Sequence, residues 1–237
     1  FLPQKKAQIT SKDLISANQK TKKVKTFPQR VCKNSNPKKL TIEKCASLIT
    51  KKKKFLFLTG SGISLAANIP TMQILLRDLK IVENENIDDF TKILLDDQHY
   101  KSLFLIIQNF LKSIESAKPT KAHKALAKLA FYLETQILTG NFDGLHEKTG
   151  ISPYNVEMQP LQHDLSPKVA KEIDAIVCIT SSYDFQSVLE RYKHFNPKGI
   201  IIAINQQKPT YLGDEDFFVK GNVQKLIPKL EKIITKR

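Results

Sequence analysis

The chain has 237 residues, of which 41% are hydrophobic, and this is enough to bury one substantial core. It contains no apolar run of about eighteen residues, so the sequence predicts no membrane-spanning helix. The net charge of +15 is uneven, because residues 1–54 carry 16 Lys and Arg against only Asp13 and Glu43. The rest of the chain is nearly neutral, which argues against a basic nucleic-acid-binding face on the globular body.

Residues 1–39 are predicted to form a basic arm. A lysine-rich segment with few apolar residues cannot bury enough surface to fold alone, so we expect it to be disordered, or ordered only against an acidic partner. RNA, anionic lipid or a protein subunit of a larger complex would serve, contacting residues 1–54. The alternative is a solvated tail or part of a targeting segment.

The cellular location is predicted from the same end of the chain. The chain begins at Phe1, and its first twelve residues hold lysines and no acid, as in a trimmed organellar precursor. With a pI of about 9.6, these features favour a mitochondrial location. The nucleus and the cytoplasm are the alternatives.

The regular pattern begins at Leu40. Apolar residues recur at helical spacing behind Thr41, a suitable N-cap, and predict a helix that ends near Lys52. Residues 55–59 then form a continuous apolar run before Gly60, which is typical of a strand buried on both faces.

The remaining pattern alternates strands and helices. Residues 71–118 lack a strand-like run and predict a helical insertion, and the later predicted strands are 135–139, 175–180 and 199–204. Predicted helices cover 122–132, 185–192 and 223–234. We therefore expect residues 40–237 to form an α/β domain with a Rossmann-like, doubly wound parallel sheet.

The three cysteines lie far apart, and no CxxC pair is present. Cys32, Cys45 and Cys178 therefore predict neither a disulfide framework nor a zinc site made from local ligand pairs. Cys178 stands in an apolar run and is expected to be a buried small hydrophobic residue.

A glycine-rich turn follows the first predicted strand. Gly60 and Gly62 would let the backbone approach a pyrophosphate, and the next helix would offer its N-terminal amides. Two glycines alone are weak support for nucleotide binding, because tight turns use glycine for steric reasons.

Three segments resemble the sirtuin family. Gly60-Ser61-Gly62-Ile63-Ser64, continuing to Asn68-Ile69-Pro70, is similar to its Gly-Ala-Gly-Ile-Ser-x-x-x-Gly-Ile-Pro signature. Residues 138–150 resemble Thr-Gln-Asn-x-Asp-x-Leu-His, and residues 119–126 match a third segment. Ser181-Ser182, Asn205 and Gly221 match later positions more loosely, so the resemblance covers about residues 40–234.

The resemblance implies a sirtuin-like fold that binds NAD or ADP-ribose. In sirtuins, an acyl-lysine oxygen attacks the nicotinamide-bearing ribose while a histidine acts as base. The cofactor-binding positions that the resemblance implies are Gly60, Ser61, Gly62, Ile63, Ser64, Asn141, Asp143, Ser181, Ser182, Asn205 and Gly221.

The departures from the family pattern fall at positions that the resemblance assigns to the active site. Gln159 occupies the position of the catalytic histidine, and an amide cannot accept a proton near neutral pH. Thr71, Met72, Gln73 and Gly140 replace the family's aspartate, phenylalanine, arginine and glutamine. His163 is the nearby candidate for a displaced base, with an ordinary surface role as the alternative.

The zinc module of the family is also missing. Only residues 161–172 separate Pro160 from the next predicted strand, so we expect no zinc and a doubtful acyl-peptide cleft. His123 and His146 lie inside family motifs and are expected to make structural hydrogen bonds.

The sequence thus predicts a degenerate sirtuin that serves as a structural or regulatory subunit of a larger assembly. A further hypothesis is a nucleotide sensor, which binds NAD or ADP-ribose without turnover. The alternative from a different class is an active NAD-dependent protein-lysine deacylase or ADP-ribosyltransferase, based on the retained Asn141 and Asp143.

Overall fold

The computed structural model describes residues 27–236 except 53, 72–73, 75–96 and 157–164. Its centre is a seven-stranded sheet in the order β1-β7-β6-β5-β2-β3-β4, in which every neighbouring pair is parallel. The strands are β1 (Lys38–Lys39), β2 (Phe55–Thr59), β3 (Ile137–Thr139), β4 (Tyr154–Asn155), β5 (Ala175–Ile179), β6 (Ile200–Asn205) and β7 (Phe217–Lys220).

The order of the strands reverses beside β2. From β2 the chain moves outward to β3 and β4, returns to pair β5 on the other side of β2, and continues to β6 and β7. This is the doubly wound topology, so the predicted fold class is confirmed. In such sheets the carboxyl ends of the strands at the reversal form a crevice.

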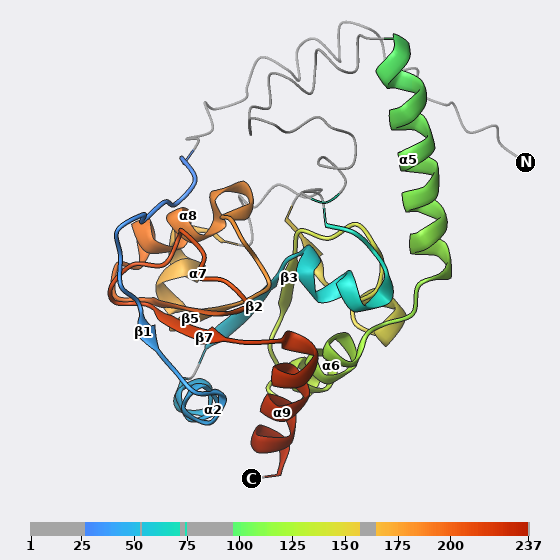
Figure 1. Ribbon diagram of the computed structural model, residues 1–237. Helices are drawn as coiled ribbons and strands as arrows, with labels where there is room; N and C mark the ends of the chain where they lie inside the picture. The colour runs from blue at the N-terminus through green and yellow to red at the C-terminus, as the bar shows by residue number, and fades with distance from the viewer. Residues whose placement is uncertain (1–26, 53, 72–73, 75–96, 157–164, 237) are drawn as a thin grey trace, which may run out of the picture.

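Helices cover both faces of the sheet (Figure 1). The helical segments are α2 (Ile42–Lys51), η1 (Ser61–Ala67), α5 (Asp97–Ser116), α6 (Lys121–Tyr132), η2 (Glu147–Thr149), α7 (Pro167–Glu172), η3 (Phe185–Ser187), α8 (Val188–Phe195) and α9 (Val223–Thr235). Those labelled η are short 3₁₀ helices. No helix among the described residues is both long and apolar enough to cross a membrane.

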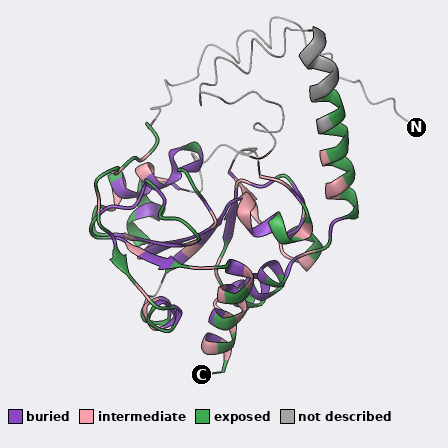
Figure 2. Ribbon diagram, in the orientation of Figure 1, coloured by how far each residue is buried: buried purple, intermediate pink, exposed green. Residues whose placement is uncertain are grey.

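Alternate residues of each central strand feed two separate cores. On β5, Val177 and Ile179 pack with α2, α6 and α9, whereas Ile176 and Cys178 pack with α7 and α8. Figure 2 shows the buried strands between partly exposed helices. Burial on both faces explains the continuous apolar runs in the sequence, and Cys178 is the buried residue that we expected.

The helix starts follow the sequence signals. The Thr41 hydroxyl accepts a hydrogen bond from the Lys44 amide at the start of α2, and Thr120 and His123 form a reciprocal capping box at the start of α6. These caps hold α2 and α6 against the face of the sheet that also carries α9.

Several elements differ from the predictions. The sequence did not predict β1, β4 or β7, which have two, two and four residues. The predicted helix at 185–192 is a 3₁₀ turn followed by α8, with a kink at Gln186 (φ 46°). The helix expected after the glycine turn is the seven-residue 3₁₀ segment η1.

The predicted boundary of the basic arm needs correction. Residues 27–39, which the sequence assigned to the arm, lie on the globular body. Lys38 and Lys39 pair with β7, and Arg30 forms ion pairs with Glu190 and Glu215. The acidic partner of this part of the chain is therefore the body itself. Residues 1–26 lie outside the described residues.

The predicted helical insertion is described only in part. Its helix α5 carries exposed apolar side chains, including Phe104, Leu105 and Leu111. Residues 75–96, also assigned to the insertion, lie outside the described residues.

Candidate functional site

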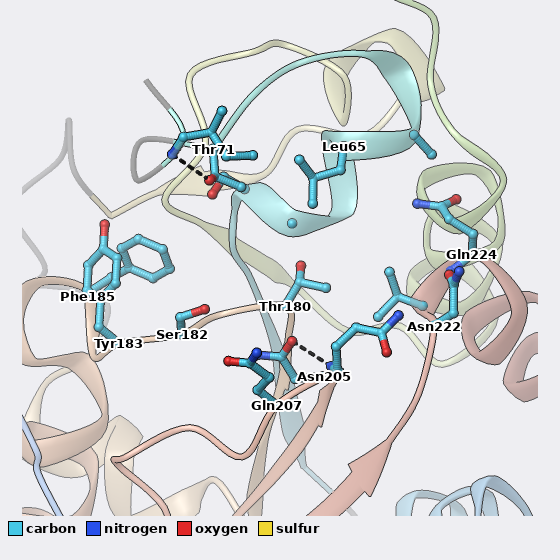
Figure 3. A pocket seen from close by; sticks show the side chains of 16 residues that line it. Leu65, Thr71, Thr180, Ser182, Tyr183, Phe185, Asn205, Gln207, Asn222 and Gln224 are labelled. Atoms are coloured by element: carbon cyan, nitrogen blue, oxygen red, sulfur yellow. Dashed lines mark hydrogen bonds between the residues drawn. The ribbon is translucent and has the colours of Figure 1, made fainter. Parts of the chain in front are cut away.

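A cavity of about 560 Å³ lies at the carboxyl ends of the strands where the strand order reverses (Figure 3). Its walls come from η1 after β2 and from the loops that follow β5, β6 and β7. Sequence and topology together place these segments at one edge, because all strands are parallel. The cavity lies where doubly wound sheets commonly bind their ligands.

The glycine turn packs directly on the end of β5. A Cβ atom on Gly60 would lie 2.6 Å from the Thr180 carbonyl oxygen, and one on Gly62 would lie 2.9 Å from the Thr180 Cβ. Both distances are too short for a side chain. These glycines are required here for close approach of two loops.

Thr180 adopts an uncommon backbone conformation at this contact. Its φ is 53°, in the left-handed region that β-branched residues rarely enter. Its hydroxyl donates a 3.0 Å hydrogen bond to the Gly60 carbonyl oxygen. Thr180 lines the cavity at this contact, and backbone strain of this kind is common at ligand sites.

One wall of the cavity is rich in carboxamides: Asn205, Gln206, Gln207, Asn222 and Gln224. Asn205 Oδ1 accepts a hydrogen bond from the Gln206 amide, and Asn222 Oδ1 caps α9 by accepting from the Gln224 amide; each bond is 2.8 Å. Gln224 Nε2 donates to the Ile63 carbonyl oxygen at 2.9 Å, which ties α9 to η1. This wall is polar and neutral.

The described lining carries no acidic, basic or histidine side chain. Hydroxyl groups come from Ser61, Thr180 and Ser182. In Figure 3, Tyr183 and Phe185 stand at one end of the cavity, and Asn222 and Gln224 at the other. The cavity can therefore bind through hydrogen bonds and aromatic contact, but its described walls offer no group that exchanges a proton near neutral pH.

A second polar cluster lies behind the glycine turn, on the side of β3. Ser64 donates a 2.5 Å hydrogen bond to Asp143 Oδ2, and the Leu145 amide donates to Asp143 Oδ1 at 2.9 Å. Asn141 Nδ2 donates to the Gly60 carbonyl oxygen at 3.3 Å, while Asn141 Oδ1 has no hydrogen-bond partner among the residues that the structure describes. Ser64, Asn141 and Asp143 are buried, and they brace the turn from inside the protein.

The two buried histidines hold the strand ends together. His146 Nε2 lies 2.9 Å from the Thr59 hydroxyl, and His123 Nδ1 lies 2.8 Å from the Thr120 hydroxyl. The two rings meet edge to face with centroids 4.8 Å apart. Burial lowers the pKa of His123 to about 4 and that of His146 to about 3, so both are neutral and structural at neutral pH, as expected.

The structure divides the predicted cofactor-binding residues into two groups. Four of them line the cavity: Ser61, Gly62, Ser182 and Asn205. The others stand behind the lining: Gly60, Ile63, Ser64, Asn141, Asp143, Ser181 and Gly221. In this second group, the Ser181 hydroxyl donates to the Tyr183 carbonyl oxygen at 2.8 Å, and the Gly221 amide donates to the Asn205 carbonyl oxygen at 2.9 Å.

Other predicted positions have mixed outcomes. Thr71 lines the cavity. Gly140 lies beneath the ring of Phe185, because a Cβ atom at Gly140 would be 2.7 Å from the Phe185 Cδ1 atom. Gln159, His163, Met72 and Gln73 lie outside the described residues.

Sequence reasoning missed the aromatic end and most of the amide wall of the cavity. The run of three carboxamides directly after the β6 apolar run, residues 205–207, was the available signal for the amide wall. For Phe185 no local signal existed, since its partner Gly140 is 45 residues away.

The geometry defines the class of protein: an α/β protein with a Rossmann-like, doubly wound parallel sheet. No family model matches the chain. Its sequence is 30% identical over 110 residues to an NAD-dependent protein deacetylase of Thermodesulfovibrio yellowstonii, a match that spans 46% of this chain and 42% of that protein. The matched part is thus less than half of the length of the curated relative.

The similarity to solved structures extends over nearly the whole length of those structures. A Sir2 homologue in complex with NAD has a TM-score of 0.63 at 20% identity, covering 86% of this chain and 98% of that one. A Sir2 homologue mutant in complex with ADP-ribose has a TM-score of 0.62 at 20% identity, covering 82% and 96%. Over part of its sequence the chain is thus similar to a sirtuin-type deacetylase, and its fold is that of the Sir2 structures.

The described residues fit a nucleotide in part. The glycine cradle at Gly60 and Gly62, where a Cβ has no room, and the amide wall suit a phosphate-linked nucleoside. Toward β3, the Phe185 ring lies at the end of the cavity and packs on Gly140. Within the described part of the chain, no cluster of His, Cys, Asp or Glu could hold a metal ion.

Proposed function

We propose that this protein is a sirtuin-fold subunit of a larger assembly that no longer turns over NAD but keeps a nucleotide-binding crevice. The observation that carries the proposal is the composition of the cavity at the strand reversal. A glycine turn and an amide wall support binding, while the described lining has no side chain able to act as general acid or base.

The sequence departures support the same proposal. Gln159 occupies the position of the catalytic histidine, and replacing a general base typically lowers a rate by about 10²- to 10⁴-fold. The two histidines of the described core do not substitute for it. His123 and His146 are fully buried and hydrogen-bonded to threonines, outside the cavity lining.

The second candidate is an active NAD-dependent protein deacylase or ADP-ribosyltransferase. It is favoured by the retained Ser64, Asn141 and Asp143, which stay together beside the glycine turn. It is also favoured by the relative that is named as an NAD-dependent protein deacetylase.

The assembly itself is inferred from charge. Residues 1–26 carry seven Lys and one acid, and they precede a segment that is already fixed on the body. We propose that they tether the protein to an acidic surface of a mitochondrial complex, either protein or RNA. Such a contact would weaken steeply with salt.

Calorimetric titration of NAD and ADP-ribose into the full chain tests the crevice. A Gly62 substitution is unsuitable as the blocked control, because any Cβ there meets Thr180. Ser182→Trp is preferable, since Ser182 is exposed and lines the cavity. Binding that is lost in Ser182→Trp supports the proposal, and no binding by the wild-type chain at millimolar ligand refutes the nucleotide crevice.

Turnover is tested separately. The full chain is incubated with NAD and an acyl-lysine peptide, and nicotinamide release is followed with and without the peptide. We expect release no faster than in Ser182→Trp. Peptide-dependent release that Ser182→Trp abolishes would establish the second candidate instead.

A further inference from the structure

A dinucleotide site in a doubly wound fold has two halves. The pyrophosphate lies at the first βα turn, and the two nucleosides extend to opposite sides of the strand reversal. In this protein one nucleoside would lie over the ends of β5, β6 and β7. The other would lie over the ends of β3 and β4.

The observed cavity occupies only the first half. Its described lining comes from η1, Thr71, Ile74 and the segments after β5, β6 and β7. The described segments after β3 and β4 contribute no lining residue. Asn141, which follows β3, is 8% exposed and lies outside the lining, although its Oδ1 has no hydrogen-bond partner in the described part of the chain.

Phe185 separates the two halves. It belongs to the segment after β5, yet its ring covers Gly140 at the end of β3, where an added Cβ would be 2.7 Å from both Cδ1 and Cε1. The ring is 4% exposed, and the Tyr183 ring packs on it with centroids 4.4 Å apart. Two aromatic rings thus stand where the second half would begin.

The backbone around Phe185 is firmly held. Asp184, immediately before it, accepts hydrogen bonds from the amides of Leu189 and Glu190 at 2.7 and 3.0 Å. The Ser187 hydroxyl donates to the Phe27 carbonyl oxygen at 2.6 Å. Because both sides of Phe185 are anchored, its backbone cannot move without breaking these polar contacts. The ring itself is held by its packing on Gly140 and Tyr183.

We propose that the cavity takes a single nucleotide, a nucleoside mono- or diphosphate, and that Phe185 excludes the second nucleoside of a dinucleotide. This inference rests on the proposed nucleotide crevice and narrows its ligand class. Phe185 determines the specificity for one nucleoside over two, and Gly140 leaves the space in which its ring packs.

Calorimetric titration of ADP and NAD into the full wild-type chain gives the first measurement. We expect ADP to bind at least as tightly as NAD, because the nicotinamide riboside finds no pocket among the described residues. Tighter binding of NAD than of ADP by wild type would overturn the inference while leaving the proposed crevice standing. Failure of both ligands to bind would overturn the proposed crevice, and the inference with it.

Phe185→Ala gives the second measurement. Removing the ring opens the way to Gly140 and Asn141, so the ratio of the Kd of NAD to that of ADP should fall by about tenfold or more. An unchanged ratio in a folded variant would overturn the inference. Phe185→Leu serves if the alanine variant does not fold, and a smaller change in the same direction is expected.

The matched control is Phe142→Ala. Phe142 is also a phenylalanine beside the end of β3, but it is 56% exposed and does not line the cavity. The ratio of the two Kd values should equal that of wild type. A shift as large as that of Phe185→Ala would mean that the ratio does not report on the ring over Gly140, and the inference would fail.

Discussion

The ring of Phe185 lies so close to Gly140 that no side-chain atom fits at position 140. Gly140→Ala places a methyl group about where the ring already lies, so it should lower the free energy of unfolding by about 1–3 kcal/mol. In a Phe185→Ala background the same substitution should cost far less. Urea unfolding of the four proteins forms a double-mutant cycle. Equal costs in both backgrounds would mean that the ring does not press on Gly140.

The buried histidine pair should make stability depend on pH. Burial lowers the pKa of His123 to about 4 and that of His146 to about 3 in the folded protein, below their ordinary value of about 6.5. The unfolded chain therefore binds more protons. The free energy of unfolding should be highest above about pH 6.5 and fall toward about pH 4.

Denaturant unfolding between pH 4 and pH 8 measures this dependence. His146→Gln offers an amide to the Thr59 hydroxyl without a titrating ring, and it should flatten the curve over this range. An equally steep loss of stability in His146→Gln would show that other groups cause it.

At the scale of elements, α6 ends in a conformation that suits glycine. Glu134 is exposed with φ 48°, and the Thr135 amide donates to the Ala130 carbonyl oxygen at 3.0 Å, as in a Schellman cap. Glu134→Gly should raise the free energy of unfolding by about 1 kcal/mol, because only glycine adopts this conformation without a Cβ clash.

Thermal and urea unfolding measure the effect of the cap. Glu134→Ala is the control, since alanine keeps the Cβ atom while also removing the carboxylate. If the alanine variant gained as much as the glycine variant, the charge of Glu134 and not its backbone conformation would be the cause.

Over the whole molecule, Arg30 links the start of the described chain to α8 and to the connection between β6 and β7. Its Nε donates to the Tyr211 carbonyl oxygen at 2.9 Å, and its guanidinium pairs with Glu190 and Glu215. The Arg30 backbone amide also donates to Asp184, next to the cavity. Arg30 thus joins its own segment to residues 184–190 and 211–215, and no local pattern in the sequence connects these three segments.

Arg30→Ala should lower the free energy of unfolding by about 2 kcal/mol or more, because charged hydrogen-bond partners lose their donor. Arg30→Lys should recover only part of this, since an ammonium cannot reproduce the planar set of donors. Urea unfolding compares the three proteins. Full recovery by lysine would mean that charge alone matters at this position.

Removal of residues 1–26 separates anchoring from folding. Residues 27–39 keep their contacts with the body in this variant, so the free energy of unfolding should change little. Binding to the purified assembly should fall sharply and lose most of its salt dependence. Unchanged binding to the assembly would refute the tethering role of these residues.

Local sequence was sufficient for the elements that are buried on both faces. The β2, β5 and β6 runs are continuously apolar because each strand feeds two cores, and α2 and α6 carry their own caps. The glycine turn was also predictable from the sequence, since two glycines directly after a strand are typical of a tight turn.

Only the tertiary structure decided which residues line the crevice and which distant residues contact one another. The two-residue strands β1 and β4 exist because neighbouring strands supply their hydrogen bonds, so their own residues carry no strand pattern. Phe185 covers Gly140, and Arg30 reaches Glu215, because the fold brings together segments that lie far apart in the sequence. Sequence by itself determined the resemblance to sirtuins, the central strands β2, β5 and β6, and the glycine turn. The packing of distant residues determined which half of the crevice is open, since such contacts depend on three-dimensional proximity that no local pattern encodes.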